Sequence, residues 1–336
     1  MTLRRGGVAA QVLAAVVAST LALAALPGSA SATQGAAAAA GTARYFGAWA
    51  QPAAGQSKIQ ALSALESRLG TRLPLVTDYS AWDEAFPSSL DKSIATRGSH
   101  LLLFVKLKRK DGSRPKWIDL ANAKKGSGLY ADMDRWAAGV KSYGKPMHLV
   151  FHKEPNEPDN QANGTAPQYV AAYRAFVAHM RNAGVSNARY VWALPATIFA
   201  NASQAASWYP GDSYVDVIGG TGANHYGCLP GIAPKWRTFA AVFAAMRTWA
   251  SAHPTRRTGV VEFETVEDPA QPGRKAQWIS DAHSVAGTSS WSQIEVLSYF
   301  NSTATDGGGV CDWRLTTSSS ALSAAAAWAD DPRYGG

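Results

Sequence analysis

Short apolar segments alternate with amphipathic segments along most of the chain. Eight segments rich in β-branched or aromatic residues, each flanked by Gly, Pro, Ser or Asn, predict strands at 43–50, 73–80, 100–108, 146–154, 188–195, 214–222, 258–265 and 294–302. Between them, apolar residues at helical spacing predict helices, most clearly at 57–70, 166–184, 238–253 and 320–329. The helix after the second strand has the least regular pattern.

This alternation predicts a single (β/α)8 TIM barrel of the α/β class over residues 43–336. The competing fold is a doubly wound open sheet. That fold usually has a Gly-rich phosphate turn after an early strand, and the sequence has none. In a barrel the chemistry lies at the carboxyl ends of the strands, so the candidate residues are expected there.

The N-terminal region has the pattern of an export signal. Two arginines precede an apolar run, which ends in Pro27 and small residues up to Ala32. This is typical of a secretory signal peptide over residues 1–32, followed by a low-complexity spacer over 33–42. A membrane anchor is the alternative, but Pro27 argues against it, and no later segment has the roughly 18 apolar residues of a span. We therefore expect a secreted, extracellular protein without a membrane partner.

Charge and cysteine content narrow the function classes. The chain has 32 basic and 24 acidic side chains, and loss of the signal peptide with its two arginines leaves a net charge of +6. Only Lys106–Lys116 forms a basic run, and such a run is usually a solvated loop, so nucleic-acid binding is not expected. The two cysteines, Cys228 and Cys311, are predicted to form a disulfide, worth roughly 4 kcal/mol.

The fourth predicted strand ends in an acidic residue. Alternation along the strand predicts that His152 and Glu154 share one face while Lys153 points to the other. Pro155 biases Glu154 toward an extended backbone, because the proline ring clashes with a helical predecessor. The carboxyl group of Glu154 is therefore expected to lie over the barrel mouth.

The seventh predicted strand supplies a second acid. Glu262 stands within an apolar strand, with Glu264 on the same face, and a carboxylate there is costly unless it is paired or functional. Acids at the ends of strands four and seven meet across a barrel mouth, as a glycosidase pair requires. Aromatic residues at other strand ends would stack on sugar rings, and the candidates for this lining are Trp49, Trp82, Trp192 and Tyr226.

These motifs together resemble a known family. Five segments at predicted strands four to eight resemble glycoside hydrolase family 26, which contains secreted β-mannanases and related endo-β-glycanases. In chain order they are FHKEPNEPDN, YVWALP, VDVIGGTGANHYG, VVEFE and IEVLSYFNS. The resemblance implies that Glu154 is the acid/base and Glu262 the nucleophile, with His152 and Glu264 beside them. It departs from the family at Lys153, where the family usually has His, and at Glu264, where Gly is expected. The Asp that commonly precedes the strand-six Tyr is not evident before Tyr226.

The resemblance implies retaining hydrolysis of a β-linked polysaccharide, with β-mannan as the first candidate, by a monomer that needs no cofactor or metal. Retention requires the two carboxyl groups to lie roughly 5 Å apart. One alternative is a carbohydrate-binding barrel that has lost catalysis. The other is a metal-dependent hydrolase that uses His152, Glu154 and His225 as ligands.

Overall fold

Eight parallel strands close into a barrel in the computed structural model, which describes residues 43–306 and 308–336. Strands pair in chain order, and the eighth pairs with the first. The strands are β1 (Tyr45–Ala50), β2 (Leu75–Ala81), β3 (His100–Lys106), β4 (Met147–Phe151), β5 (Ala188–Pro195), β6 (Val217–Asn224), β7 (Arg257–Thr265) and β8 (Ile294–Asn301). The predicted (β/α)8 barrel is confirmed. The expected signal peptide (1–32) and spacer (33–42) lie outside the described residues.

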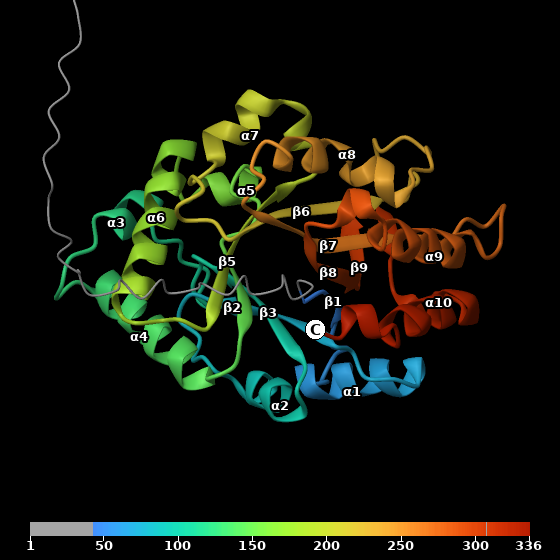
Figure 1. The fold of residues 1–336 in the computed structure, drawn as a ribbon, viewed down its shortest axis with the longest axis horizontal. Coiled ribbons are helices and arrows are strands. Elements are labelled where there is room, and N and C mark those ends of the chain that lie inside the picture. Colours follow the sequence, from blue (N-terminus) through green and yellow to red (C-terminus); the bar gives the residue numbers. More distant parts are fainter. Residues whose placement is uncertain (1–42, 307) are drawn as a thin grey trace, which may run out of the picture. The chain divides into compact units, whose positions relative to one another are not determined.

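Helices surround these strands (Figure 1). They are α1 (Lys58–Leu69), α2 (Ser89–Arg97), α3 (Trp117–Ala121), α4 (Gly128–Tyr143), α5 (Pro158–Gln161), α6 (Ala166–Asn182), α7 (Ala202–Trp208), α8 (Phe239–Ala250), α9 (Arg274–Ala286) and α10 (Ser319–Ala329). A short hairpin, β9 (Thr303–Asp306) and β10 (Gly309–Asp312), follows β8. Within the described part of the chain, no helix is long and apolar enough to cross a membrane.

Local sequence explains where these helices begin and end. In α1, Ser57 and Gln60 form a reciprocal capping box, and Gly70 ends the helix with a left-handed backbone of φ 74°. Pro167 stands in the first turn of α6, where its missing N–H has no helical partner to lose. The helix predicted over 57–70 from its apolar spacing and from Gly70 is confirmed.

Two apolar layers hold the barrel together, because side chains alternate along each strand. The inner layer consists of mostly β-branched or small residues from the strands: Leu75, Leu102, Phe104, Val150, Val191, Ala193, Val217, Val261 and Val296. The outer layer is much larger and lies between strands and helices. Most of the chain's buried aromatic side chains belong to this outer layer, which decides where the predicted aromatic residues lie.

A polar cluster occupies the amino-terminal end of the barrel. The ring of His148 lies between His100, at 2.6 Å, and the carboxylate of Glu295, which also pairs with Arg189. Burial raises the pKa of Glu295, but the hydrogen bond and charge of His148 and the charge of Arg189 outweigh it, so the net shift is downward. This carboxylate is therefore ionised and stabilising in the folded protein.

Replacing Glu295 with alanine is expected to lower the free energy of unfolding by about 3 kcal/mol, because it leaves the buried ring of His148 without its hydrogen-bond partner and Arg189 without its counter-charge. Since the folded pKa of Glu295 is depressed, its stabilisation is present above the unfolded pKa and is lost as pH falls through the folded pKa. Urea unfolding at pH 7 and pH 3 measures both effects. Equal midpoints for wild type and Glu295→Ala at pH 7 would contradict the prediction.

Candidate active site

The chain leaves strand geometry at the end of β4 earlier than the sequence predicts. β4 ends at Phe151, and His152 and Glu154 have left-handed backbones with φ of 47° and 51°. The expectation that Pro155 holds Glu154 extended is therefore wrong. Only three non-glycine residues in the described part of the chain have positive φ, and two of them lie here. Such strained backbones concentrate at functional sites.

Hydrogen bonds hold this strained segment in place. The backbone N–H of His152 donates to Val105 of β3 at 2.8 Å, and that of Glu154 donates to Ala193 of β5 at 2.9 Å. The buried side chain of Asn160 donates to the carbonyl oxygens of Lys153 and Glu154, at 3.2 and 2.9 Å. Both neighbouring strands and α5 thus fix the conformation, which overrides the local preference of a residue before proline.

This conformation exchanges the predicted directions of two side chains. His152 is buried, with its ring edge against Trp117 and its Nδ1 accepting the N–H of Leu107 at 3.2 Å. Burial lowers the pKa of His152 to about 3, so the ring is neutral. Lys153 instead extends into the barrel mouth beside Glu154. The prediction that His152 shares the face of Glu154, with Lys153 opposite, is wrong.

A β-bulge directs the second acid to the mouth. Pairing between β6 and β7 skips one residue between Val260 and Glu262. Val260 and Phe263 both belong to the outer layer, and Val261 belongs to the inner layer. Two residues, Val261 and Glu262, therefore lie between two outward-facing residues, where regular alternation would place one. The extra residue breaks the alternation and leaves Glu262 facing inward, where it lines a cavity together with Glu264.

One ammonium group joins the two acids. The Nζ of Lys153 pairs with Oε2 of Glu262 and lies 3.5 Å from Oε2 of Glu154. These two contacts place the facing carboxylate oxygens no more than about 6 Å apart. The other oxygen of each acid accepts a hydroxyl: that of Tyr79 for Glu262 and that of Thr221 for Glu154. The pair is therefore close together and rigidly held.

Burial and charge shape the ionisation of these groups. Burial raises the pKa of Glu262, and the ammonium of Lys153 only partly reverses this, so the net direction is upward. Burial lowers the pKa of Lys153, but the carboxylates of Glu262 and Glu154 outweigh it and keep the ammonium charged. Burial and the charge of Glu262 raise the pKa of Glu264 well above its usual range, which favours the neutral form of this acid.

Two cavities meet at Glu154. One, of about 410 Å³, extends over the ends of β2 and β3 and is lined by Lys58, Tyr79, Ser80, Ala81, Glu84, Phe104, Val105, Lys106, Lys108, Arg109, Lys153, Glu154 and Asn160. The other, of about 360 Å³, extends over the ends of β5 to β7 and contains Glu154, Glu262 and Glu264. The carboxylate pair therefore lies between two hollows, as the cleavage point of a chain-like ligand would.

Two of the predicted sugar-stacking residues lie elsewhere. Trp82 is fully buried among aromatic rings that include Trp136 and Phe176. Trp192 is fully buried on the outer side of β5, where it packs against Trp249. Because alternate strand residues face the helices, aromatic residues near strand ends often fill the outer layer. The prediction that Trp82 and Trp192 bind substrate is wrong.

The two other aromatic candidates differ in position. Trp49, half-buried near the end of β1, meets the ring of Tyr79 edge-on at 5.0 Å and so stays beside the mouth. Tyr226 packs against Trp236 at 5.2 Å and lines neither cavity that contains Glu154. The hydroxyl on Glu262 comes from Tyr79 of β2. Its place at a strand end was visible in the sequence, but its contact with β7 was not.

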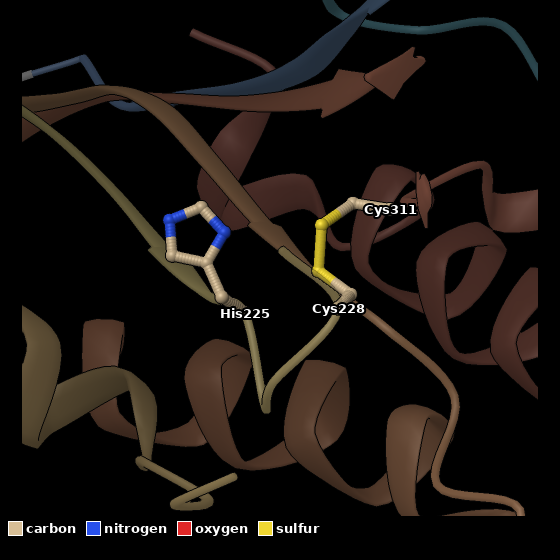
Figure 2. A group of neighbouring side chains, drawn as sticks. All are labelled: His225, Cys228 and Cys311. Atoms are coloured by element: carbon tan, nitrogen blue, oxygen red, sulfur yellow. A yellow bond between two sulfur atoms is a disulfide. The ribbon is translucent and has the colours of Figure 1, made fainter. Parts of the chain in front are cut away.

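The disulfide between Cys228 and Cys311 is confirmed, with Cα atoms 5.1 Å apart. Figure 2 shows the ring of His225 beside it. His225, Cys228 and Cys311 are the one group of potential metal ligands found among the described residues. The sulfur atoms of the two cysteines are bonded to each other in the disulfide. The ligand set of the metal-dependent alternative, with His152 and Glu154 beside His225, is not assembled in this part of the chain.

Comparisons with known proteins agree on the type of barrel. The family model for glycosyl hydrolase family 26 matches residues 159–266, which include Glu262 and begin just after Glu154. The chain is 26% identical over 294 residues to Endoglucanase H of Acetivibrio thermocellus. This match covers 83% of the chain and 29% of the relative, so the chain spans less than a third of that relative's length.

Solved structures share the fold at low identity. The catalytic domain of an endo-β-1,4-mannanase from Bacillus sp. JAMB-750 is 15% identical, with a TM-score of 0.60 over 88% of this chain and 87% of that one. A β-mannanase from Bacteroides ovatus is 13% identical, with a TM-score of 0.58 and coverage of 87% and 90%. A modular endo-β-1,4-mannanase from Cellulomonas fimi is 17% identical, with a TM-score of 0.58 and coverage of 86% and 71%. Over residues 159–266 the chain is similar to glycosyl hydrolase family 26, and its barrel has the same fold as the solved mannanase structures.

Proposed function

We propose that this protein is a retaining glycoside hydrolase that cleaves a β-linked polysaccharide, with Glu154 as acid/base and Glu262 as nucleophile. One observation carries the proposal: both acids, from the ends of β4 and β7, meet on the ammonium of Lys153. Their separation of no more than about 6 Å favours direct attack, because an inverting enzyme leaves room for a water between its carboxyl groups.

The reaction follows from the positions of the two acids. Glu262 attacks the anomeric carbon as a carboxylate, the bond from that carbon to the leaving oxygen breaks, and Glu154 gives its proton to that oxygen. Water then attacks the same carbon, Glu154 takes the proton from the water, and the bond to Glu262 breaks. Two inversions at one carbon retain its configuration. Neutral Glu264 beside Glu262 adds no second negative charge to the nucleophile's surroundings.

A polysaccharide panel tests the proposal. Mannan, lichenan, xylan and mixed-linkage glucan are incubated with wild type, and NMR follows the anomeric configuration of the first product. Mannan is the first polymer to test, because the structural neighbours are named as mannanases, while the curated relative is named as an endoglucanase. A product formed with inverted configuration would refute the retaining mechanism.

The alternative is a carbohydrate-binding barrel that no longer cleaves, and Lys153 is the observation that favours it. Its ammonium contacts both acids and stands where glycoside hydrolase family 26 usually has histidine. Binding to a polymer without cleavage, equal in wild type and Glu154→Gln, would support this alternative. Cleavage that Glu154→Gln abolishes would exclude it.

Replacing Tyr79 with phenylalanine is expected to lower kcat about tenfold, with KM nearly unchanged, because the hydroxyl holds Glu262 in its attacking orientation. The ring itself keeps its stacking on Phe104 at 4.8 Å, so stability should change little. Steady-state kinetics and thermal unfolding measure the two effects. Tyr226→Phe is the control, and a kcat loss in that variant as large as in Tyr79→Phe would contradict the assignment.

We also propose that the protein acts outside the cell. The arginine-started apolar run before Ala32 supports export, and a disulfide is compatible with an oxidising compartment. Expression in a secreting host followed by N-terminal sequencing tests this. A mature protein that begins at Thr33 is expected, and retention of the full chain in the cytoplasm would refute it.

A further inference from the structure

The larger cavity beside Glu154 has an unusual charge. Five cations line it, Lys58, Lys106, Lys108, Arg109 and Lys153, against two carboxylates, Glu84 and Glu154. Part of the cavity wall is aromatic, because it includes the stacked rings of Tyr79 and Phe104, whose centroids are 4.8 Å apart. The cavity thus combines a face on which a sugar ring could stack with an excess of positive charge.

Three of the cations already have carboxylate partners. Lys58 pairs with Asp78 at 2.6 Å and Arg109 with Asp132 at 2.6 Å, while Lys153 joins the two catalytic acids. Lys106 and Lys108 have no ion pair within 4.0 Å among the described residues. Glu84 is tied by its Oε2 to the backbone N–H of Ala81 at 2.8 Å. Two ammonium groups are therefore left without a counter-charge of their own.

The strand pattern aims these two lysines at the cavity. Phe104, Lys106 and Lys108 stand at alternate positions at and beyond the end of β3, and all three line the cavity. Leu107 between them is fully buried in the outer layer. The sequence indicated that the run Lys106–Lys116 was a solvated loop, and its first residues are instead part of the cleft.

The surroundings of Lys106 are unfavourable for its charge. Burial, followed by the charges of Arg114 and Lys108, lowers the pKa of Lys106, and the weaker opposing charge of Asp159 does not restore it. Asp159 itself pairs with Arg114 at 3.2 Å. A half-buried cation beside other cations gains most from an anion brought by a ligand.

We infer that this cavity binds an acidic sugar unit, one that carries a carboxylate or a sulfate ester, and that Lys106 and Lys108 contact its charge. The inference rests on the proposed function and names the substrate class: a β-linked polysaccharide with anionic substituents. Adjacent to Glu154, the acidic unit lies next to the bond that is cleaved. Lys106 and Lys108 are then specificity-determining residues.

Matched oligosaccharides test the inference. Neutral β-1,4-linked mannan and glucan oligosaccharides are compared with the same chains oxidised to carboxylates at carbon 6 and with their 6-sulfated forms. Calorimetry on Glu154→Gln protein gives Kd without turnover. We expect one charged form to bind about tenfold tighter than its neutral parent, with the difference shrinking as salt is raised.

Lysine variants in the same background locate the contact. Lys106→Ala and Lys108→Ala should each weaken binding of the charged ligand about five- to tenfold and leave the neutral ligand within about twofold. The control Lys125→Ala removes an equal charge from an exposed position outside both cavities and should change neither. Thermal unfolding checks that every variant is folded. Equal binding of charged and neutral chains, or equal losses for both, would overturn the inference.

Two outcomes separate this inference from the proposed function. If wild type cleaves neutral polysaccharide and shows no preference for charged chains, the inference fails and the hydrolase assignment stands. If charged chains bind tightly through the two lysines and wild type cleaves neither charged nor neutral chains, the inference stands and the hydrolase assignment fails.

Discussion

Replacing Glu262 with glutamine is expected to lower kcat/KM about ten-thousandfold on whichever polysaccharide the protein cleaves, a loss of about 5.5 kcal/mol of transition-state stabilisation. The amide keeps the shape of the side chain and its contact with Tyr79, but it cannot form the glycosyl ester. The substitution removes the ion pair with Lys153 but hardly changes the shape that a bound substrate meets, so the loss should lie in kcat and not in KM.

The neighbouring acid supplies the matched control. Glu264 lies on the same strand and in the same cavity, and its raised pKa keeps it neutral. Because glutamine is also neutral and of similar shape, Glu264→Gln should cost less than about tenfold. A loss in Glu264→Gln as large as in Glu262→Gln would mean that the nucleophile has been assigned to the wrong carboxylate.

Covalent trapping identifies the nucleophile directly. A 2-fluoro glycoside of the cleaved sugar slows hydrolysis of the glycosyl-enzyme more than its formation, and peptide mass mapping then locates the label. The label is expected on the peptide that contains Glu262. A label on Glu154 or Glu264 would disprove the assignment.

The fold was predictable because its signal repeats along the chain. Each strand has a run of β-branched or aromatic residues between turn residues, and each helix has its own caps, as with Ser57 and Gly70 around α1. Because the pattern repeats eight times, an error in the bounds of one strand or helix does not change the predicted fold. The end of β4 shows this, since misplacing it by three residues left the barrel unchanged.

The site was less predictable because single residues decide it. Strict alternation predicts the wrong direction for Lys153, because two left-handed residues flank it. It would also turn Glu262 outward, to the side that Val260 faces, and only a bulge that the sequence does not reveal turns this side chain inward. Both Tyr79 and Trp192 lie near strand ends, so the sequence could not show which of them faces the site. Tyr79 contacts Glu262, whereas Trp192 is buried against the helices. These outcomes depend on contacts between distant segments.

Replacing Lys153 with methionine is expected to lower kcat/KM between about a hundredfold and a thousandfold, because one half-buried ammonium positions both acids and stabilises the ionised form of the proposed nucleophile. Burial raises the pKa of Glu262, and Lys153 is the main group that lowers it. Removing the ammonium therefore raises this pKa further. Since Glu262 reacts as a carboxylate, the acid limb of the pH–rate profile should move to higher pH, and the loss should be greatest in acid.

Two further variants distinguish this role from simple damage to the site. Lys153→His introduces the residue that glycoside hydrolase family 26 usually has at this position and should recover part of the activity, because a protonated imidazole can still contact Glu262. Lys125→Met removes an exposed charge and should leave the pH profile unchanged. An acid limb that does not move in Lys153→Met would contradict the electrostatic role. Higher activity in Lys153→Met than in wild type would mean that the ammonium inhibits the two acids. Removing a group that stabilises the reacting carboxylate would lower the activity, not raise it.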